Sequence, residues 1–362
     1  MAKTLSDLLG GVNRLGTVET VKSGIPNPLP PSMFNVSRRV IGRSTTYGKS
    51  QGQRKGAQQN QYGAPAKQVQ INGIQEVGVN MIHSYDVHNH NPLVLQNIMN
   101  QQNGTLQDLA VDELTRQVKN FMDRYDITRI HAVQSAIANG KIWLDATGNL
   151  LFSDSGAVDT IDYGVPANNR NQINGIITAS WAVDSTDIVE DIVQIKRRAI
   201  ETTGIPLKYA LYSKNIPSYV AGNTRASALI NANPVLANQF WSSGTLPAGF
   251  CGLDWVDVGT SFALTSAGVV TQIFGDDTIV FLPEISPEWY EMVEGSYLIP
   301  GGNLGAVSGD ANGALSNITS VFGKFSYATV SQNPVTIQQF GGDTFLPIIK
   351  NGSAVFIADV TP

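Results

Sequence analysis

The sequence predicts an α+β protein with an extended N-terminal part. A stripe of apolar residues at helical spacing continues from Leu106 to Asn139, far longer than most helices of compact domains. After it, short runs of strand-forming residues alternate with helical segments, and four such runs close the chain. In the first 78 residues, prolines and glycines interrupt these patterns. With 362 residues, the chain is long enough to bury a substantial apolar core.

The N-terminal part divides into an arm and a hairpin. Residues 1–36 are expected to form an extended arm, because the prolines of "GIPNPLPPS" preclude a continuous helix and favour a polyproline-like conformation. Residues 37–78 are expected to form a long hairpin, with strand formers at each end and a glycine-rich tip between them. The expected strands are "FNVSRRVI" and "KQVQINGIQEVGV".

This N-terminal part is basic, although the whole chain is acidic. No acidic residue occurs between Glu19 and Glu76, whereas the net charge of the chain is −5. The basic residues of this stretch are Lys22, Arg38, Arg39, Arg43, Lys49, Arg54, Lys55 and Lys67. They give it a charge of +8 and leave 16 bases against 29 acids, or −13, elsewhere. The extension and the body are therefore electrostatically complementary.

The long helix is expected over residues 106–139. Thr105 is a good N-cap, and Asn139 and Gly140 supply a left-handed C-cap. The apolar stripe slips once, around residues 126–128, and then resumes. At 1.5 Å per residue, such a helix is about 50 Å long, so an elongated body is expected around it.

Shorter elements follow in order. A hairpin is expected in "KIWLDATGNLLF", followed by a polar connection over 157–180. A second helix is expected to begin after Ser185 or Thr186 and to end at Gly204. Two more helices are predicted near 216–229 and 234–241. The predicted strands after the second helix are "PLKYALYS", "LDWVDVGT", "GVVTQIF", "DTIVFLPE", "KFSYATVSQ", "PVTIQQFG", "TFLPIIK" and "GSAVFIADV".

No pattern in the sequence favours catalysis, a metal or a cofactor. His88 and His90 would share one side of a strand, but only Asp86 is nearby as a third ligand. The stretch 154–156 matches the three-residue Asp-Ser-Gly signature of aspartic proteases, yet it lies in a polar loop and is better explained as a turn. No phosphate-binding loop and no G-x-S-x-G elbow is present. We expect neither an enzyme nor a bound cofactor.

Composition favours an intracellular chain whose surface is covered by other chains. Cys251 is the single cysteine, which excludes an intrachain disulfide, and no apolar run is long enough to span a membrane. Only 15% of residues are charged, and charged side chains are depleted at the cores of interfaces. A neutral, polar-surfaced monomer is the alternative.

The order of elements resembles that of the HK97-fold major capsid proteins of tailed phages, in particular the lambda-like capsid protein E family. Three stretches carry the resemblance, and it extends from about Leu106 to the end, whereas the first hundred residues match in layout only. The stretches are "TDIVEDIVQIKRRAIETTGIPLKYALYSKNIPSYVAGN", "GLDWVDVGTSFALTSAGVVTQIFGDDTIVFLPE" and "FSYATVSQNPVTIQQFGGDTFLPIIKNGSAVFIADV".

The resemblance implies a domain organisation and a function. Residues 1–36 look like the N-terminal arm, 37–78 like the E-loop, 79–185 like the P-domain with its spine helix, and 186–323 like the A-domain. Residues 324–362 would complete the P-domain. The implied activity is self-assembly, as hexamers and pentamers, into an icosahedral virion shell around double-stranded DNA. A scaffolding protein, a portal and a decoration protein are implied partners, assembly is expected in the host cytoplasm, and no membrane is involved.

Within this interpretation, the bases of the E-loop and arm are expected to contact a neighbouring subunit. They are Arg38, Arg39, Arg43, Lys49, Arg54, Lys55 and Lys67. Two rival functions remain: a nucleic-acid-binding coat or nucleoid protein that uses the basic arm, and another virion component such as a tail-tube or decoration protein. Retention of DNA at about 0.3 M salt would favour the first rival. The long helix distinguishes the capsid interpretation from the second.

Overall fold

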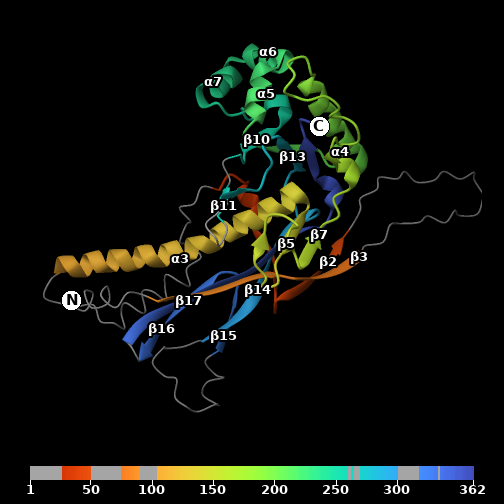
Figure 1. Ribbon diagram of the computed structural model, residues 1–362. Helices are drawn as coiled ribbons and strands as arrows, with labels where there is room; N and C mark the ends of the chain where they lie inside the picture. Colours follow the sequence, from red (N-terminus) through yellow and green to blue (C-terminus); the bar gives the residue numbers. More distant parts are fainter. Residues whose placement is uncertain are drawn as a thin grey trace, which may run out of the picture.

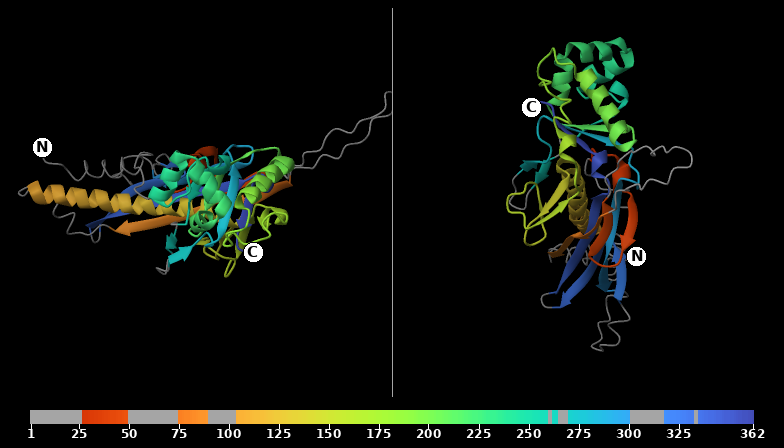
Figure 2. Two further views of the ribbon diagram at one scale, coloured as in Figure 1. Left: turned by 90° about the horizontal axis from the view of Figure 1, so that it is seen from above. Right: turned by 90° about the vertical axis from the view of Figure 1, so that its right-hand side faces the viewer.

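Two β-sheets, each with its own helices, organise the molecule (Figure 1). The computed structural model describes residues 27–49, 75–89, 104–259, 262–264, 270–300, 318–332 and 335–362. The predicted arm up to residue 26 and the hairpin tip, residues 50–74, therefore lie outside the described residues. The long helix α3 runs along the first sheet, and the helices α4–α7 gather around the second sheet at the other end (Figures 1 and 2).

The first sheet has six strands in the order β1-β14-β17-β16, with β15 beside β14 and β4 beside β17. β1 pairs with β14 in parallel, and the other pairs are antiparallel. The bounds are β1 (Val36–Val40), β4 (Ile82–Asn89), β14 (Tyr290–Pro300), β15 (Ile318–Phe322), β16 (Phe325–Gln332) and β17 (Val335–Ile349).

β17 is one continuous strand of 15 residues, where two separate strands were predicted. Gly341 and Gly342 suggested a break in the sequence, but both lie inside the strand and pair with β16 and β4. A Cβ at Gly341 would lie 2.5 Å from the Phe121 ring of α3. The glycine therefore lets the helix approach the strand closely and does not interrupt it.

The predicted long helix is confirmed as α3 (Gly104–Asn139). It is 36 residues long, which corresponds to about 54 Å. Its second half is buried against the six-stranded sheet and a small sheet, with Val133, Ala136 and Ile137 fully enclosed. Gly140 follows with φ +63°, the left-handed conformation expected of the C-cap.

A three-stranded sheet follows α3 directly, in the order β6-β5-β7. The predicted hairpin is confirmed by the pairing of β5 (Lys141–Leu144) with β6 (Leu150–Leu151). β7 (Asp159–Asp162) pairs with the other edge of β5, inside the stretch that was expected to be a polar connection. Only Ile161 of its four residues is buried, so buried and exposed side chains hardly alternate along β7.

The second large sheet has five strands in the order β10-β9-β13-β18-β8. Both faces of β13 are buried: Ile279 and Phe281 pack with the helices, whereas Val280 and Leu282 join the core beneath α3. This explains the unbroken apolar run of "TIVFLP". The bounds are β8 (Arg170–Asn171), β9 (Leu207–Tyr212), β10 (Asp254–Asp257), β13 (Thr278–Pro283) and β18 (Phe356–Asp359).

The two sheets do not follow the expected domain boundaries, which lie between residues 185 and 186 and between residues 323 and 324. β14 and β15 fall in the range expected for the A-domain, yet they pair within the six-stranded sheet. β18, at the end of the chain, pairs with β13 in the five-stranded sheet. The chain thus crosses between the two sheets more often than the order of elements indicated, because strand pairing joins residues far apart in sequence.

Helices α4–α7 cover one face of the second sheet. α4 (Ile188–Thr203) begins at Asp187, whose carboxylate accepts a hydrogen bond from the Glu190 backbone N–H, and not at the predicted Ser185 or Thr186. The helix predicted over 216–229 is two helices, because Asn223 ends the first and caps the second. These are α5 (Ile216–Gly222) and α6 (Thr224–Ala232), followed by α7 (Pro234–Ser243).

The smaller elements complete the described structure. β11 (Phe262–Leu264) and β12 (Val270–Gln272) form a two-stranded sheet, and four single turns of 3₁₀ helix occur elsewhere. The 3₁₀ turns are η1 (Pro31–Phe34), η2 (Ala167–Asn169), η3 (Phe250–Gly252) and η4 (Gly352–Ala354). None of the helices in the described ranges has the length and apolarity needed to cross a membrane.

Candidate functional site at the root of the hairpin

The N-terminal hairpin is built from β2 (Ser44–Lys49) and β3 (Gln75–Asn80), which pair in antiparallel register from Ser44 opposite Asn80 to Lys49 opposite Gln75. The strand predicted in "FNVSRRVI" is present as β1, but its expected place in the hairpin was wrong, because β1 pairs with β14 in the six-stranded sheet. Gly42, with φ +105°, separates β1 from β2. The start of the glycine-rich stretch thus forms a strand, and residues 50–74 connect the two strands of the hairpin.

Two predicted contact residues form ion pairs within the chain. The Arg38 guanidinium lies 3.1 Å from Glu291 of β14 and also donates to the Thr46 carbonyl at 3.1 Å. Arg39 Nε lies 3.4 Å from Glu294 Oε2. Both glutamates are buried, whereas the two arginine side chains are 41% and 53% exposed. These pairs hold β1 and the hairpin on the six-stranded sheet.

The other predicted residues divide into two described and three outside the described ranges. Arg43 lies over the Tyr297 ring at 5.5 Å, a cation–π contact. Lys49 Nζ donates to the Asp162 carbonyl at 3.2 Å, which ties the hairpin to β7. Arg54, Lys55 and Lys67 belong to the connection outside the described residues. The role of these seven bases between subunits stays a prediction.

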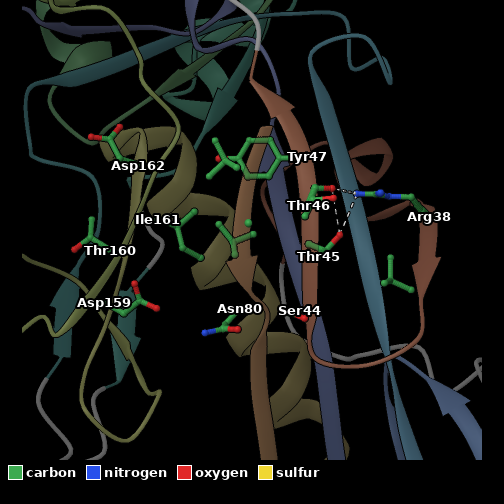
Figure 3. A pocket seen from close by; sticks show the side chains of 14 residues that line it. Arg38, Ser44, Thr45, Thr46, Tyr47, Asn80, Asp159, Thr160, Ile161 and Asp162 are labelled. Atoms are coloured by element: carbon green, nitrogen blue, oxygen red, sulfur yellow. Dashed lines mark hydrogen bonds between the residues drawn. The ribbon is translucent and has the colours of Figure 1, made fainter. Parts of the chain in front are cut away.

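A cleft of about 660 Å³ opens between the hairpin root and β7 (Figure 3). One wall carries residues 44–47 of β2 and residues 77–80 of β3, and the other is β7. Arg38 and Val40 of β1 complete the lining. β2 and β7, which are more than 100 residues apart in sequence, therefore face one another across this space.

Tyr47 is the most buried polar side chain of the cleft. Only 4% of its surface is exposed, and its ring lies 6.4 Å from that of Tyr163. Burial, together with the nearby Asp162 carboxylate, raises the pKa of the Tyr47 phenol to about 12. Its hydroxyl is buried without a hydrogen-bond partner within the described structure. A buried hydroxyl without a partner is unfavourable, so the packing of the Tyr47 ring must offset this cost.

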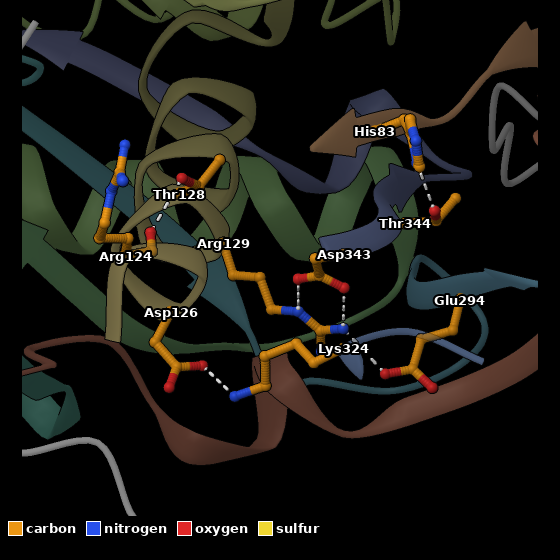
Figure 4. A network of polar contacts seen from close by, with 9 residues as sticks. All are labelled: His83, Arg124, Asp126, Thr128, Arg129, Glu294, Lys324, Asp343 and Thr344. Atoms are coloured by element: carbon orange, nitrogen blue, oxygen red, sulfur yellow. Dashed lines mark hydrogen bonds and ion pairs between the residues drawn. The ribbon is translucent and has the colours of Figure 1, made fainter. Parts of the chain in front are cut away.

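A buried ionic network lies between α3 and the six-stranded sheet (Figure 4). The Arg129 guanidinium donates to both oxygens of Asp343 in β17, at 2.6 and 2.7 Å, and to Glu294 Oε1 in β14 at 3.0 Å. Although burial opposes it, the attraction of Asp343 and Glu294 raises the pKa of Arg129. Two hydrogen bonds from one guanidinium to both oxygens of one carboxylate are the bidentate geometry of an ionised arginine–carboxylate pair.

This network reaches the hairpin through Glu294, which also pairs with Arg39 of β1. At the other side, Lys324 pairs with Asp126 of α3 (Figure 4). The connected charges of Arg39, Glu294, Arg129 and Asp343 therefore fix the position of the long helix, the central strands and the strand that leads into the hairpin.

Sequence reasoning missed this network. A signal was present, because Arg129 is the sole charge in "ITRIHAVQSAIAN" and Asp343 the sole charge in "FGGDTFLPIIK" before its final lysine. A single charge in an apolar stretch indicates a buried partner of opposite sign. The sequence could not identify the partner, since 214 residues separate the two.

The residues weighed for catalysis and metal binding are not assembled into a site among the described residues. Asp154 belongs to a turn in which its carbonyl accepts the Ala157 N–H. No three metal-ligating side chains come together within the described ranges, and His90 lies outside them. His83 is engaged with Thr344, 2.8 Å away. Burial raises the pKa of the Cys251 thiol to about 11, which makes a thiolate nucleophile unfavourable.

A family model described as "Phage major capsid protein E" matches residues 11–293, more than three quarters of the chain. The chain belongs to the phage major capsid protein E family. This capsid protein therefore has a structural, shell-forming function in the virion, as the sequence predicted. No curated protein matches its sequence.

Similar solved structures include other phage capsids. The putative capsid protein of an E. coli CFT073 prophage is 12% identical, with a TM-score of 0.50 over 79% of each chain. The capsid of cyanophage P-SCSP1u is 12% identical over 96% and 97% of the two chains, with a TM-score of 0.45. The predicted HK97-like capsid fold is confirmed, and the first of these likenesses carries that conclusion at the level of fold.

Proposed function

We propose that this capsid protein assembles as hexamers and pentamers into an icosahedral shell that encloses the double-stranded DNA of a tailed phage. Assembly takes place in the host cytoplasm, with a scaffolding protein, a portal and a decoration protein as partners. The observation that carries this proposal is the β2–β3 hairpin, whose 25-residue connection has three bases and no acid. Such an extension gives each copy a long reach and a defined sign of charge.

The domain names follow the sheets in this proposal. We assign α3 and the six-stranded sheet to the P-domain, and α4–α7 with the five-stranded sheet to the A-domain, together with β18. Apart from β1, which belongs to the six-stranded sheet, residues 1–36 form the N-terminal arm and 37–78 the E-loop. The E-loop contacts a neighbouring subunit, so that one surface binds a different surface on the next copy, as a closed shell requires.

A second surface supports contacts between copies. Residues 215–253 contain a single charged residue, Arg225, and this stretch includes α5, α6 and α7 at the end of the molecule far from β16 (Figure 1). Trp241 and Val235 of α7 are 58% and 69% exposed. The centres of interfaces are depleted of charged residues and enriched in tryptophan, whose side chain is exposed in the single chain and buried in the complex. This end of the A-domain meets other copies around the symmetry axes.

Charge reversal of Arg54 and Lys55 tests the hairpin contact. The double variant R54D/K55D is expected to reduce the yield of shells or to change their shape, because both bases pair with acidic groups on a neighbour. The matched control reverses Lys208 and Lys214, which are exposed in the single chain and paired with Glu284 and Asp276. Unchanged particle yield and shape for R54D/K55D, measured by sedimentation and electron microscopy, would contradict the contact.

A further inference from the structure

We propose that residues 170–175 form a strained latch, which ties the end of α3 to the second large sheet and opens when the angle between these two parts of the chain changes. The inference deepens the proposed shell function and depends on it, because one chain must fit both hexamers and pentamers. Rings of different size place their copies at different angles, so a chain that enters both needs a joint that adjusts. The latch begins at β8 and continues into a turn.

The backbone of the latch is strained. Three of the four non-glycine residues with positive φ among the described residues lie here: Asn171 at +56°, Ile173 at +40° and Asn174 at +55°. Asparagine tolerates the left-handed region, whereas a β-branched side chain is disfavoured there, so Ile173 bears most of the strain. Strain of this kind persists only where the surrounding structure imposes it, and it is typical of segments that switch.

Contacts with the second large sheet impose the strained conformation. β8 pairs in parallel with β18, and just before β8 the Asn169 side chain donates to the carbonyls of Ser353 and Val355. Two residues after β8, the Ile173 side chain is fully buried in the core around α4. The chain turns from the strand into this core with the positive φ of Ile173. If β8 separates from β18, the backbone can return to a negative φ while the side chain stays buried.

The Arg170 side chain ties the latch to the end of α3. Its guanidinium packs against Gly140, where an added Cβ would lie 2.7 Å from Arg170 Nη2. Its Nε donates to the Val165 carbonyl at 3.3 Å. A cation is favourable at this end of a helix, because the last carbonyls carry a partial negative charge. Opening of β8 therefore releases α3 from the second sheet at this point.

A second cleft, of about 410 Å³, lies beside the latch and gives the Arg170 side chain room to move. The end of α3 and β5 line it from one part of the chain, and β8 and β18 line it from the other. Elsewhere the two parts share a core, in which Val280 and Leu282 of β13 pack beneath α3. We therefore expect a small change in angle, by sliding and not by separation.

A comparison of glycine with alanine tests the strain. At an ordinary buried position alanine gives the more stable protein, because glycine loses more conformational freedom on folding. At Ile173 we expect the reverse order, with Ile173→Gly unfolding at a higher urea concentration than Ile173→Ala. Ile177 is the matched control, since it is equally buried in the same core without a positive φ, and there the alanine variant should be the more stable. Higher stability of Ile173→Ala than of Ile173→Gly would overturn the latch.

Hydrogen–deuterium exchange tests the opening in the folded subunit. Arg170→Ala removes the contact with Gly140 and is expected to speed exchange in peptides that cover residues 165–175 by about tenfold, with no change in β9 and β13. Lys141→Ala is the matched control, because Lys141 lines the same cleft but pairs with Asp162. Equal exchange in Arg170→Ala and the wild type would show that this side chain holds no latch, and the proposal would be rejected.

Electron microscopy of assembled particles connects the latch to the shell. Arg170→Ala is expected to give particles of several diameters, because an open latch no longer restricts the angle within each ring, whereas Lys141→Ala should resemble the wild type. Particles of one diameter from Arg170→Ala, despite its faster exchange, would contradict a role of the latch in assembly. Failure of the wild-type protein to form any shell would instead reject the shell function, and the exchange experiment would still decide whether the latch exists.

Discussion

Arg129 connects three separate parts of the chain through one side chain. It reaches from α3 to Asp343 in β17 and to Glu294 in β14, and all three side chains are less than 10% exposed. Burying these charges is unfavourable unless every one is paired. Here the pairing is complete, so the network specifies the position of the helix on the sheet more than it adds net stability.

Removing Arg129 is therefore expected to be severe. R129A leaves Asp343 and Glu294 buried without their shared partner, and we expect a loss of about 3–5 kcal/mol in the free energy of unfolding. Urea denaturation of the purified subunit measures it. The control K208A breaks an exposed pair with Glu284 and is expected to cost less than about 1 kcal/mol. Equal losses in the free energy of unfolding for the two variants would show that the buried network contributes no more to stability than an exposed ion pair.

Asp145 supplies a pH-dependent contribution of known sign. Its carboxylate accepts hydrogen bonds from the Thr147 hydroxyl and from the backbone of Asn149 and Thr147, which lower its pKa to about 2. A lowered pKa stabilises the fold above the ordinary value near 3.8, and this stability is lost as the pH falls toward 2. Asp145→Asn keeps an acceptor but does not titrate, so its free energy of unfolding should fall less steeply between pH 4 and 2. Parallel curves for the two proteins would be the contrary result.

Among the elements, those with a local signal could be predicted from the sequence. α3, α4 and the β5–β6 hairpin depend on periodicity, caps and turn residues that lie next to one another in the chain. The errors arose where distant partners decide. β17 continues through Gly341 because α3 packs there, β18 joins the second sheet because β13 has a free edge, and β1 leaves the hairpin to pair with β14.

The contact between α3 and β17 predicts a sensitive position. A Cβ at Gly341 would lie 2.5 Å from Phe121 Cε1 and 3.1 Å from the Tyr125 hydroxyl, and both rings are buried. Gly341→Ala is expected to destabilise the subunit by about 1–3 kcal/mol because helix and strand must separate. Gly78→Ala is the control, since its nearest neighbour is Thr46 Cγ2 at 4.0 Å. Thermal unfolding compares them, and a stable Gly341→Ala variant would show that the helix can shift freely.

Over the whole molecule, a basic extension is separate from an acidic body, and this separation suits repeated contacts between copies. The basic stretch of +8 belongs to the arm and hairpin, and the remaining −13 belongs to the body. Composition was enough to predict this division, because it requires no knowledge of the fold. The cleft could not be predicted, because it forms only when β7 lies opposite the hairpin root, and β7 carries almost no strand signal in its sequence.

Electron microscopy of the overexpressed, full-length protein tests the central claim most directly. If the protein assembles as proposed, closed particles of uniform diameter will form when it is expressed alone or together with the proposed scaffolding protein, and they will sediment as one species. Rods, or soluble subunits that never close into particles at any protein concentration, would contradict the account.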